Sequence, residues 1–298
     1  TSYLKTNDFS SAANSTTFLK IMPHTSAANL AITFSIPGPI YATCSACAAS
    51  TQAIGQGYEA ISSGRLERVI AGGAEELHIG VAAVFDVLGA TSTRFNGDPS
   101  GTPRPFDAKR DGIVVGEGAG TLILEDYELA RGRGCKIYGE IAGYYTNNSS
   151  SHMTSPSIDG LYYCAKGALD NAGIAPSDIY YVNAHATGTQ LGDSAESHAI
   201  ARLFGRNIKV SSTKGHLGHL MGAAGVLETI ASIGMLEQGM ILPTRNLESP
   251  GAECGDIDYV MKNEPASALE YVLKNSFAFG GINASLVLRR GDVDERSK

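Results

Sequence analysis

Two segments of the chain combine residue types that can carry out thiol and imidazole chemistry. Cys44 and Cys47 form a C-x-x-C pattern, which fits a redox pair, half of a metal site, or one nucleophile beside an inert neighbour. Further along, His185 follows an apolar run, and His219 follows Lys214 in a Gly-rich segment. A thiol that imidazoles can serve is a candidate for acyl transfer, so the role of the two cysteines decides the chemistry.

The predicted elements around the cysteines separate these roles. In a redox pair the first cysteine is the exposed attacking thiol at a helix start. Here Cys44 falls inside a predicted strand that includes residues 38–43, and Cys47 falls in the turn before a helix predicted at 48–63. We therefore expect Cys44 to be a small buried side chain. The helix start favours the thiolate of Cys47, although a structural buried cysteine is the alternative.

Composition excludes several classes of function. The 298 residues are 43% hydrophobic and 18% charged, as in folded globular proteins. A net charge of −7 disfavours nucleic acid or an anionic membrane as a general partner. No apolar run is long enough to span a bilayer, and five scattered cysteines favour a reduced, cytoplasmic setting. His216 and His219 have no cysteine or carboxylate pattern beside them, so we expect no metal.

The elements that position these residues alternate between strands and helices, which predicts an α/β fold around a mostly parallel sheet. Predicted strands lie at 67–73, 120–126, 136–145, 179–185, 208–212, 271–280 and 284–290, and predicted helices at 48–63, 160–173, 193–205 and 219–239.

One arrangement occurs twice along the chain. A strand runs through a small-residue turn into a helix, with Cys47 at the first turn of one helix and His219 at the first turn of the other. This repetition indicates a duplicated fold with a site between its halves, although two common units can also agree by chance.

Six segments together resemble one family, the β-ketoacyl synthases, which are decarboxylating condensing enzymes. They are SACAASTQAIG, RPFDAKRDGIVVGEGAGTLILED, HMTSP, NAHATGT, STKGHLGHLMGAAG and NSFAFGGINASLVLRR, and they follow the family's order over nearly the whole chain. The resemblance to the elongating β-ketoacyl-acyl carrier protein synthases implies the thiolase-like five-layer αβαβα fold of two duplicated halves. Residues 1–134 would be a partial first half with the nucleophile, and 135–298 the second half with the histidines.

The resemblance also implies a reaction. It is the Claisen condensation of an acyl thioester, held on Cys47, with malonyl-acyl carrier protein, in fatty-acid or polyketide elongation. His185 and His219 match the family's two histidines, which support decarboxylation and hold the enolate oxygen. Lys214 matches the active-site lysine and Glu228 its acidic partner. If the helix start supplies the thiolate, neither histidine is indispensable for acyl loading.

Further residues would serve the substrate. Thr187 and Thr189 match hydroxyls that bind the pantetheine arm, and Thr154 in HMTSP belongs to the same binding set. Phe279 matches the aromatic that gates the acyl pocket, and its backbone N–H with that of Cys47 would form the oxyanion hole. No cofactor is expected, because the pantetheine arm arrives on acyl carrier protein.

The resemblance also implies protein partners and a missing N-terminal segment. The family's nucleophile follows a first strand-and-helix segment that is absent before Thr1, so we expect a processed or truncated start. We expect acyl carrier protein as partner, and a homodimer through residues 36–44 or a related partner subunit.

Three other functions fit parts of the sequence. A specialised polyketide or aryl-polyene synthase is the main alternative, since its motifs would be the same. A thiolase would need a second cysteine near NSFAFGGINAS, and Cys254 lies outside that segment. A non-catalytic chain-length subunit would lack Cys47. HATGT in place of the family's usual HGTST, and Gly215, His216 and Leu217 after Lys214, leave substrate preference open.

Overall fold

The structure, a computed structural model, describes residues 15–291. The chain divides into two compact units, Thr1–Cys44 and Ser45–Lys298. The first unit contains α3 (Ser15–Ile21) and α4 (Thr25–Thr33), followed by an extended segment. The strand predicted at 38–43 is not formed, and this prediction was wrong, because none of the described strands pairs with the segment. A boundary at 134/135 stays a prediction.

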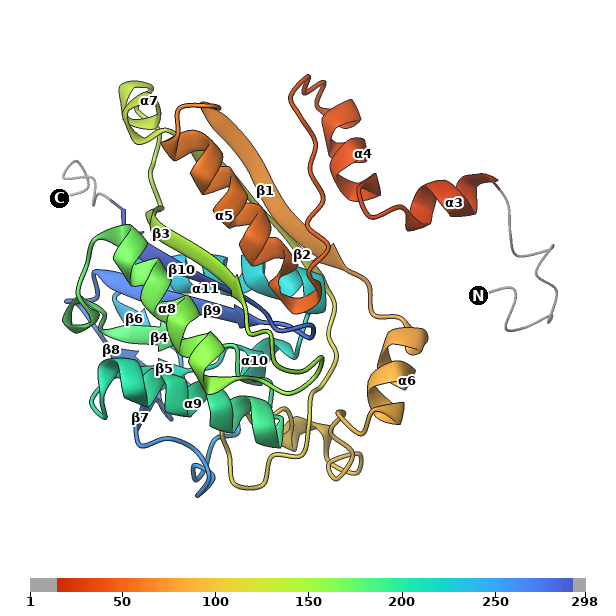
Figure 1. The fold of residues 1–298 in the computed structure, drawn as a ribbon, viewed down its shortest axis with the longest axis vertical. Coiled ribbons are helices and arrows are strands. Elements are labelled where there is room, and N and C mark those ends of the chain that lie inside the picture. The colour runs from red at the N-terminus through yellow and green to blue at the C-terminus, as the bar shows by residue number, and fades with distance from the viewer. Residues whose placement is uncertain (1–14, 292–298) are drawn as a thin grey trace. The chain divides into compact units, whose positions relative to one another are not determined.

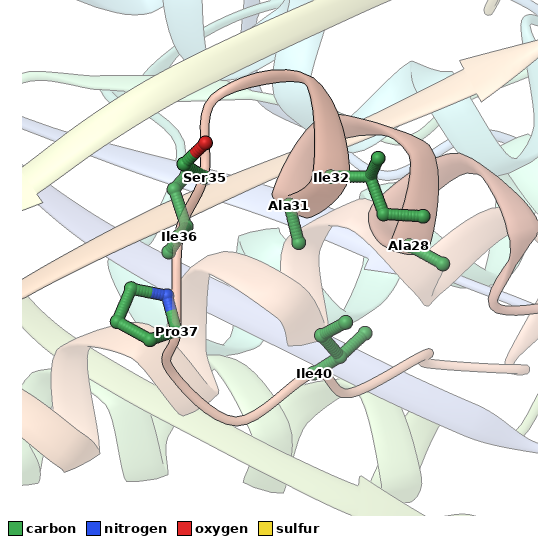
Figure 2. Close-up of a pocket in the computed structure, with 7 residues that line it drawn as sticks. All are labelled: Ala28, Ala31, Ile32, Ser35, Ile36, Pro37 and Ile40. Carbon is green, nitrogen blue, oxygen red and sulfur yellow. The ribbon is translucent and has the colours of Figure 1, made fainter.

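The first unit has an apolar hollow of about 390 Å³. Figure 2 shows Ala28, Ala31 and Ile32 on one side of α4, with Ile40 on the chain that turns back opposite them. Ile32 is 77% exposed and Tyr41 68% exposed. The unit therefore presents apolar side chains that its own described residues do not cover.

The second unit contains the remaining elements (Figure 1). Its strands are β1 (Arg68–Glu75), β2 (Gly118–Glu125), β3 (Gly139–Asn148), β4 (Tyr181–Asn183), β5 (Lys209–Ser211), β6 (Met240–Ile241), β7 (Asp258–Tyr259), β8 (Glu264–Pro265), β9 (Tyr271–Phe277) and β10 (Ile282–Arg290). Its helices are α5 (Ala49–Ser62), α6 (Ile79–Val87), α7 (Tyr127–Gly132), α8 (Ile158–Ala172), α9 (Gln190–Phe204), α10 (Lys214–Leu217) and α11 (Ala224–Gln238). Short 3-10 turns are η1 (Ala46–Ala48), η2 (Pro99–Gly101), η3 (Pro176–Asp178) and η4 (Met221–Ala223).

The largest sheet is mixed, but five of its six strands run in one direction and only β10 runs against them, which agrees with the predicted mostly parallel sheet. Its order is β3-β10-β9-β4-β5-β7. β4 runs parallel to β5 and β9, whereas β10 runs antiparallel to both β3 and β9. The short turn between β9 and β10 explains the reversed direction of β10, because such a turn joins only antiparallel neighbours. Gly280 and Gly281 supply it with φ of 87° and 72°, a backbone region that glycine enters at little cost.

Two helices form a layer between this sheet and a second one. α5 and α11 contact each other, the antiparallel pair β1–β2 on one side, and β3, β9 or β10 on the other. α8 lies against the far face of the six-stranded sheet, beside α9 (Figure 1). The second unit thus stacks a sheet, a helix pair, a sheet and a helix pair. This α/β layering fits the layered fold that the resemblance implies, and Ile70 and Ile123 are exposed on the outer face of β1–β2.

Glycines in α5 allow this close stacking. A Cβ atom at Gly55 would lie 2.2 Å from the Tyr144 ring on β3, and one at Gly57 would lie 2.8 Å from Leu124 on β2. Glycine inside a helix costs about 1 kcal/mol relative to alanine, and here that cost is offset by contact with both sheets. Within the described residues, no helix is long and apolar enough to cross a membrane.

Candidate active site

Two short 3-10 turns bring the candidate nucleophile and one histidine to the ends of the central helices. Cys47 lies in η1, directly before α5, and His219 lies two residues before η4, which leads into α11. Each turn contains a non-glycine residue in the left-handed region, Ala46 with φ of 47° and Met221 with φ of 42°. Such residues store backbone strain and are often found at functional sites. The turn and helix of the repeated arrangement therefore occur twice in space, whereas the strand precedes only His219, because the segment 38–43 forms none.

The cysteine and both histidines meet in the interior. The Sγ atom of Cys47 lies 3.0 Å from Nε2 of His219. The rings of His185 and His219 are 5.3 Å apart between centroids and nearly perpendicular. His185 follows β4, whose parallel pairing with β5 and β9 directs its end toward the site. All three side chains are buried, so the sequence-based grouping of these residues agrees with the geometry.

Burial sets the protonation states of this group. It raises the pKa of the Cys47 thiol to about 11, and the nearby Lys214 ammonium only partly offsets that rise. Loss of water therefore opposes the expected helix-start thiolate, which stays a prediction. Burial, and then the charge of Lys214, lowers the pKa of His185 and of His219 well below the usual value. Burial thus favours a neutral thiol beside neutral imidazoles, with Nε2 of His219 within hydrogen-bond distance of the Cys47 sulfur.

Two carboxylates hold the loop that carries His185, and the sequence analysis missed both. Glu196 accepts hydrogen bonds from the backbone N–H groups of His185 at 2.8 Å and Ala186 at 2.7 Å. Asp193 accepts one from the N–H of Thr187 at 3.0 Å. Burial raises the pKa of Glu196 to about 7 and that of Asp193 to about 6. The sequence did contain a signal for them: two acidic residues lie near the start of the helix that follows the His185 loop. Acidic side chains in such a position can accept hydrogen bonds from unpaired backbone N–H groups.

A buried charge cluster lies beneath the histidines. Lys214 Nζ pairs with Glu228 Oε1, which is the pairing expected from the sequence. Lys274 was missed: its Nζ lies 3.1 Å from Glu228 Oε2, and it is completely buried on β9. A lysine in the middle of an apolar strand was the signal, because lysine is almost never fully buried without a partner.

A cavity of about 390 Å³ reaches Cys47, His185 and His219. The substrate-binding candidates Thr154, Thr187, Thr189 and Phe279 all line it. The hydroxyls of Thr187 and Thr189 lie 3.2 Å apart, and the Phe279 ring lies 6.0 Å from that of Phe85. The cavity thus offers hydroxyls to a polar arm and aromatic rings to an apolar chain.

Cys44 is exposed, so its prediction as a buried side chain was wrong. It belongs to the first unit, in an extended segment without the predicted strand that would have covered it.

Three side chains of the site offer donor atoms that a metal ion could use. Within residues 15–291, the donor atoms of Cys47, His185 and His219 lie within 4.8 Å of one another, a set that a zinc ion can use. Absence of a metal stays a prediction.

Comparison with known proteins identifies the family. The model of the β-ketoacyl synthase N-terminal domain matches residues 2–130, and that of the C-terminal domain matches residues 138–248. A solved β-ketoacyl synthase from Burkholderia phymatum STM815 is 46% identical with a TM-score of 0.93, covering 97% of this chain and 70% of that one. A second solved structure holds a type II polyketide acyl-carrier protein in complex with its ketosynthase bound to the hexaketide. The match has 34% identity and a TM-score of 0.89, and it covers 94% of this chain and 70% of that one.

A curated relative, 3-oxoacyl-[acyl-carrier-protein] synthase 2 of Rhizobium meliloti (strain 1021), is 42% identical over 270 residues, or 89% of this chain. The chain spans 64% of that relative's length. Fold, buried cysteine–histidine group and family models agree: the chain belongs to the β-ketoacyl synthase family and has its thiolase-like fold.

Proposed function

We propose that the protein catalyses the decarboxylative condensation of an acyl thioester with malonyl-acyl carrier protein. The observation that carries the proposal is the 3.0 Å contact between Cys47 Sγ and His219 Nε2, with His185 beside it at the cavity. A thiol, a neutral imidazole that accepts its proton and a second imidazole are sufficient for acyl transfer followed by stabilisation of an enolate.

Acyl loading exchanges one thioester for another. The Cys47 sulfur forms a bond to the acyl carbonyl carbon while the bond from that carbon to the pantetheine sulfur breaks. The thiol hydrogen passes to Nε2 of His219 and from there to the departing pantetheine sulfur. Because the pKa of Cys47 is about 11, attack without this proton acceptor would use a very small thiolate fraction at neutral pH.

Condensation begins when the malonyl group loses carbon dioxide. The electron pair of the broken C–C bond forms an enolate, whose oxygen accepts hydrogen bonds from the N–H groups of His185 and His219. Acylated Cys47 has no hydrogen to give, so Nε2 of His219 is then free to carry its ring hydrogen. The enolate carbon bonds to the acyl carbon as the C–S bond to Cys47 breaks, and the released sulfur takes a proton from water.

The remaining candidates would bind the substrate. Thr187 and Thr189 would hydrogen-bond the pantetheine arm with Thr154, and Phe279 beside Phe85 would contact the acyl chain, because these side chains line one cavity. We also keep the Phe279 and Cys47 N–H groups as the oxyanion hole. No cofactor enters this scheme. Fatty-acid and polyketide elongation both fit, since the relatives include 3-oxoacyl synthases and the matched complex holds a hexaketide.

Acyl carrier protein and a second subunit are the proposed partners. The matched polyketide ketosynthase is in complex with its acyl-carrier protein. A homodimer, or a pair with a related subunit, would cover the apolar residues that the first unit exposes, among them Ile32 and Tyr41. We retain the cytoplasm as the proposed location.

Incubation with acyl carrier proteins tests the proposal. Chains of several lengths are presented with malonyl-acyl carrier protein labelled in its free carboxyl group. We expect labelled carbon dioxide and a β-ketoacyl product in equal amounts, and no product from Cys47→Ala. Release of free fatty acid or of coenzyme A-dependent products without carbon dioxide would indicate another member of the thiolase-like fold.

A further inference from the structure

Lys274 occupies a position that the proposed reaction has not yet used. It is the fourth residue of β9 and has no exposed surface. Its ammonium lies 2.8 Å from the Thr51 hydroxyl on α5, hydrogen-bonds Ser276 on β9 and lies 3.1 Å from Glu228 Oε2 on α11. Lys274 therefore connects the helix that follows Cys47 with the helix that follows His219.

The charges around Glu228 do not balance. Lys214 already pairs with Oε1, and all three side chains are essentially fully buried. One lysine neutralises one carboxylate, so a second protonated lysine leaves a net positive charge in a water-poor interior. Such a charge is expensive to bury. Burial accordingly lowers the pKa of Lys274 to about 8, even though Glu228 favours its charged form.

Packing alone does not require this lysine. The hydroxyls of Thr51 and Ser276 lie 2.8 Å apart and can hydrogen-bond each other. Glu228 would keep Lys214 as its partner. Removing the Lys274 ammonium thus leaves a neutral pair and paired hydroxyls, and an apolar side chain of similar length would fill the space.

The excess charge acts toward the two histidines. Lys274 and Lys214 both lower the pKa of His185 and of His219, after the larger effect of burial. Their positive charges keep the imidazoles neutral, and they also favour an enolate that forms against those rings. The ionisable groups acting on Lys274 are Glu228 on α11, Lys214 on α10 and Glu196 on α9.

We propose that Lys274 is a positioning residue of the condensing site: it fixes Glu228 and, through it, Lys214, and it supplies the net positive charge against which the enolate forms. The inference rests on the proposed condensing function. In this view the buried excess charge lowers the stability of the fold, and it serves decarboxylation rather than acyl loading.

The variants Lys274→Met and Lys274→Gln separate charge from hydrogen bonding, because glutamine keeps a donor and methionine does not. For both we expect carbon dioxide release from malonyl-acyl carrier protein to fall roughly tenfold or more, the equivalent of one pKa unit of lost electrostatic stabilisation. Acyl loading of Cys47 should stay within about threefold, and Lys274→Met should melt no lower than wild type, because a buried excess charge has been removed. Lys136→Met is the matched control, since it breaks an exposed pair with Glu237 on the same helix α11.

The pH profile gives a test that needs no variant. In the wild type, decarboxylation should fall as the pH rises through about 8, where Lys274 loses its proton. Neither Cys47, with a pKa of about 11, nor the histidines titrate in that region. Glu196, with a pKa of about 7, titrates close to it, but both variants keep Glu196, so a step that Glu196 causes would persist in them. The fall in decarboxylation at about pH 8 should be absent from both variants. The loss of decarboxylation at acid pH should begin at higher pH in the variants, because the positive charge of Lys274 no longer opposes protonation of the histidines.

The outcomes distinguish the two proposals. A wild-type protein that releases no carbon dioxide overturns the proposed function, and this inference falls with it. An active wild type without the alkaline step, or variants that decarboxylate at the wild-type rate, overturns the inference alone. Variants that melt much lower and lose loading and decarboxylation equally assign Lys274 a purely structural role, which also overturns it.

Discussion

Cys47 Sγ and His219 Nε2 are in hydrogen-bond contact although 172 positions separate the two residues in the sequence. Each stands at the start of one of the two central helices, so the contact depends on how α5 and α11 pack. Gly225 permits that packing, since a Cβ atom there would lie 2.3 Å from the Thr51 hydroxyl. The candidate nucleophile and its proton acceptor are therefore positioned by the layer between the sheets.

The protonation state of Cys47 can be measured by alkylation. Iodoacetamide reacts with the thiolate, so with a pKa of about 11 the rate on the Cys47 peptide should rise about tenfold per pH unit between pH 7 and 10. Peptide-resolved mass spectrometry separates this peptide from those of the exposed Cys44 and Cys135. A rate that is already constant at pH 7 would restore the helix-start thiolate.

The two histidines should differ in acyl loading. His219→Ala removes the acceptor of the Cys47 proton and should slow both loading and decarboxylation. His185→Ala should leave loading largely intact and lower decarboxylation by about a hundredfold, the usual effect of losing one donor to a developing oxyanion. Both steps are measured separately, by protein mass and by carbon dioxide release. Wild-type loading by His219→Ala would contradict the assigned proton transfer.

Glu228→Gln should destabilise the fold strongly. The neutral amide leaves Lys214 and Lys274 buried without a counter-charge, and breaking a buried pair in this way costs about 3–5 kcal/mol. Urea unfolding at pH 7 measures the loss. Glu237→Gln on the same helix is the control, because its pair with Lys136 is exposed and should contribute less than about 1 kcal/mol. Equal stability of the two variants would show that the lysines are not both charged.

Self-association should depend on the apolar surface of the first unit. We expect sedimentation to give a dimer at micromolar concentration, and Tyr41→Asp to weaken it because a charge would enter an apolar contact. Tyr163→Asp, exposed on α8 of the second unit, should leave the dimer intact. A wild-type monomer at that concentration argues against both a homodimer and this surface.

The sequence predicted the helices and strands of the second unit well where a periodic pattern had a partner to bury it. The helix predicted at 48–63 and the strand at 284–290 are formed as α5 and β10. The segment 38–43 has the same apolar character, but its described neighbours provide no strand to pair with it. The mostly parallel direction of the main sheet was predicted correctly, but the reversal of β10 was not, because alternation along the chain does not determine which strands become neighbours.

Within the site, the sequence identified the reactive residue types. It did not identify their protonation states or the side chains that hold them in place. Cys47, His185 and His219 were grouped correctly, whereas the state of the thiol depends on burial, which only the packed structure defines. Glu196 acts through backbone N–H groups and Lys274 through a carboxylate already paired with Lys214. Such second partners have no spacing rule in the sequence, because they come from other elements of the fold.

The most direct test of the account is to locate the acyl group after the protein has been incubated with acyl-acyl carrier protein alone. The protein's mass should increase by one acyl group, the modified peptide should contain Cys47, and Cys47→Ala should show no increase. Cys44→Ala should be modified as the wild type is. An acyl group on Cys44, or equal modification of Cys47→Ala, would contradict the assignment of Cys47 as the nucleophile.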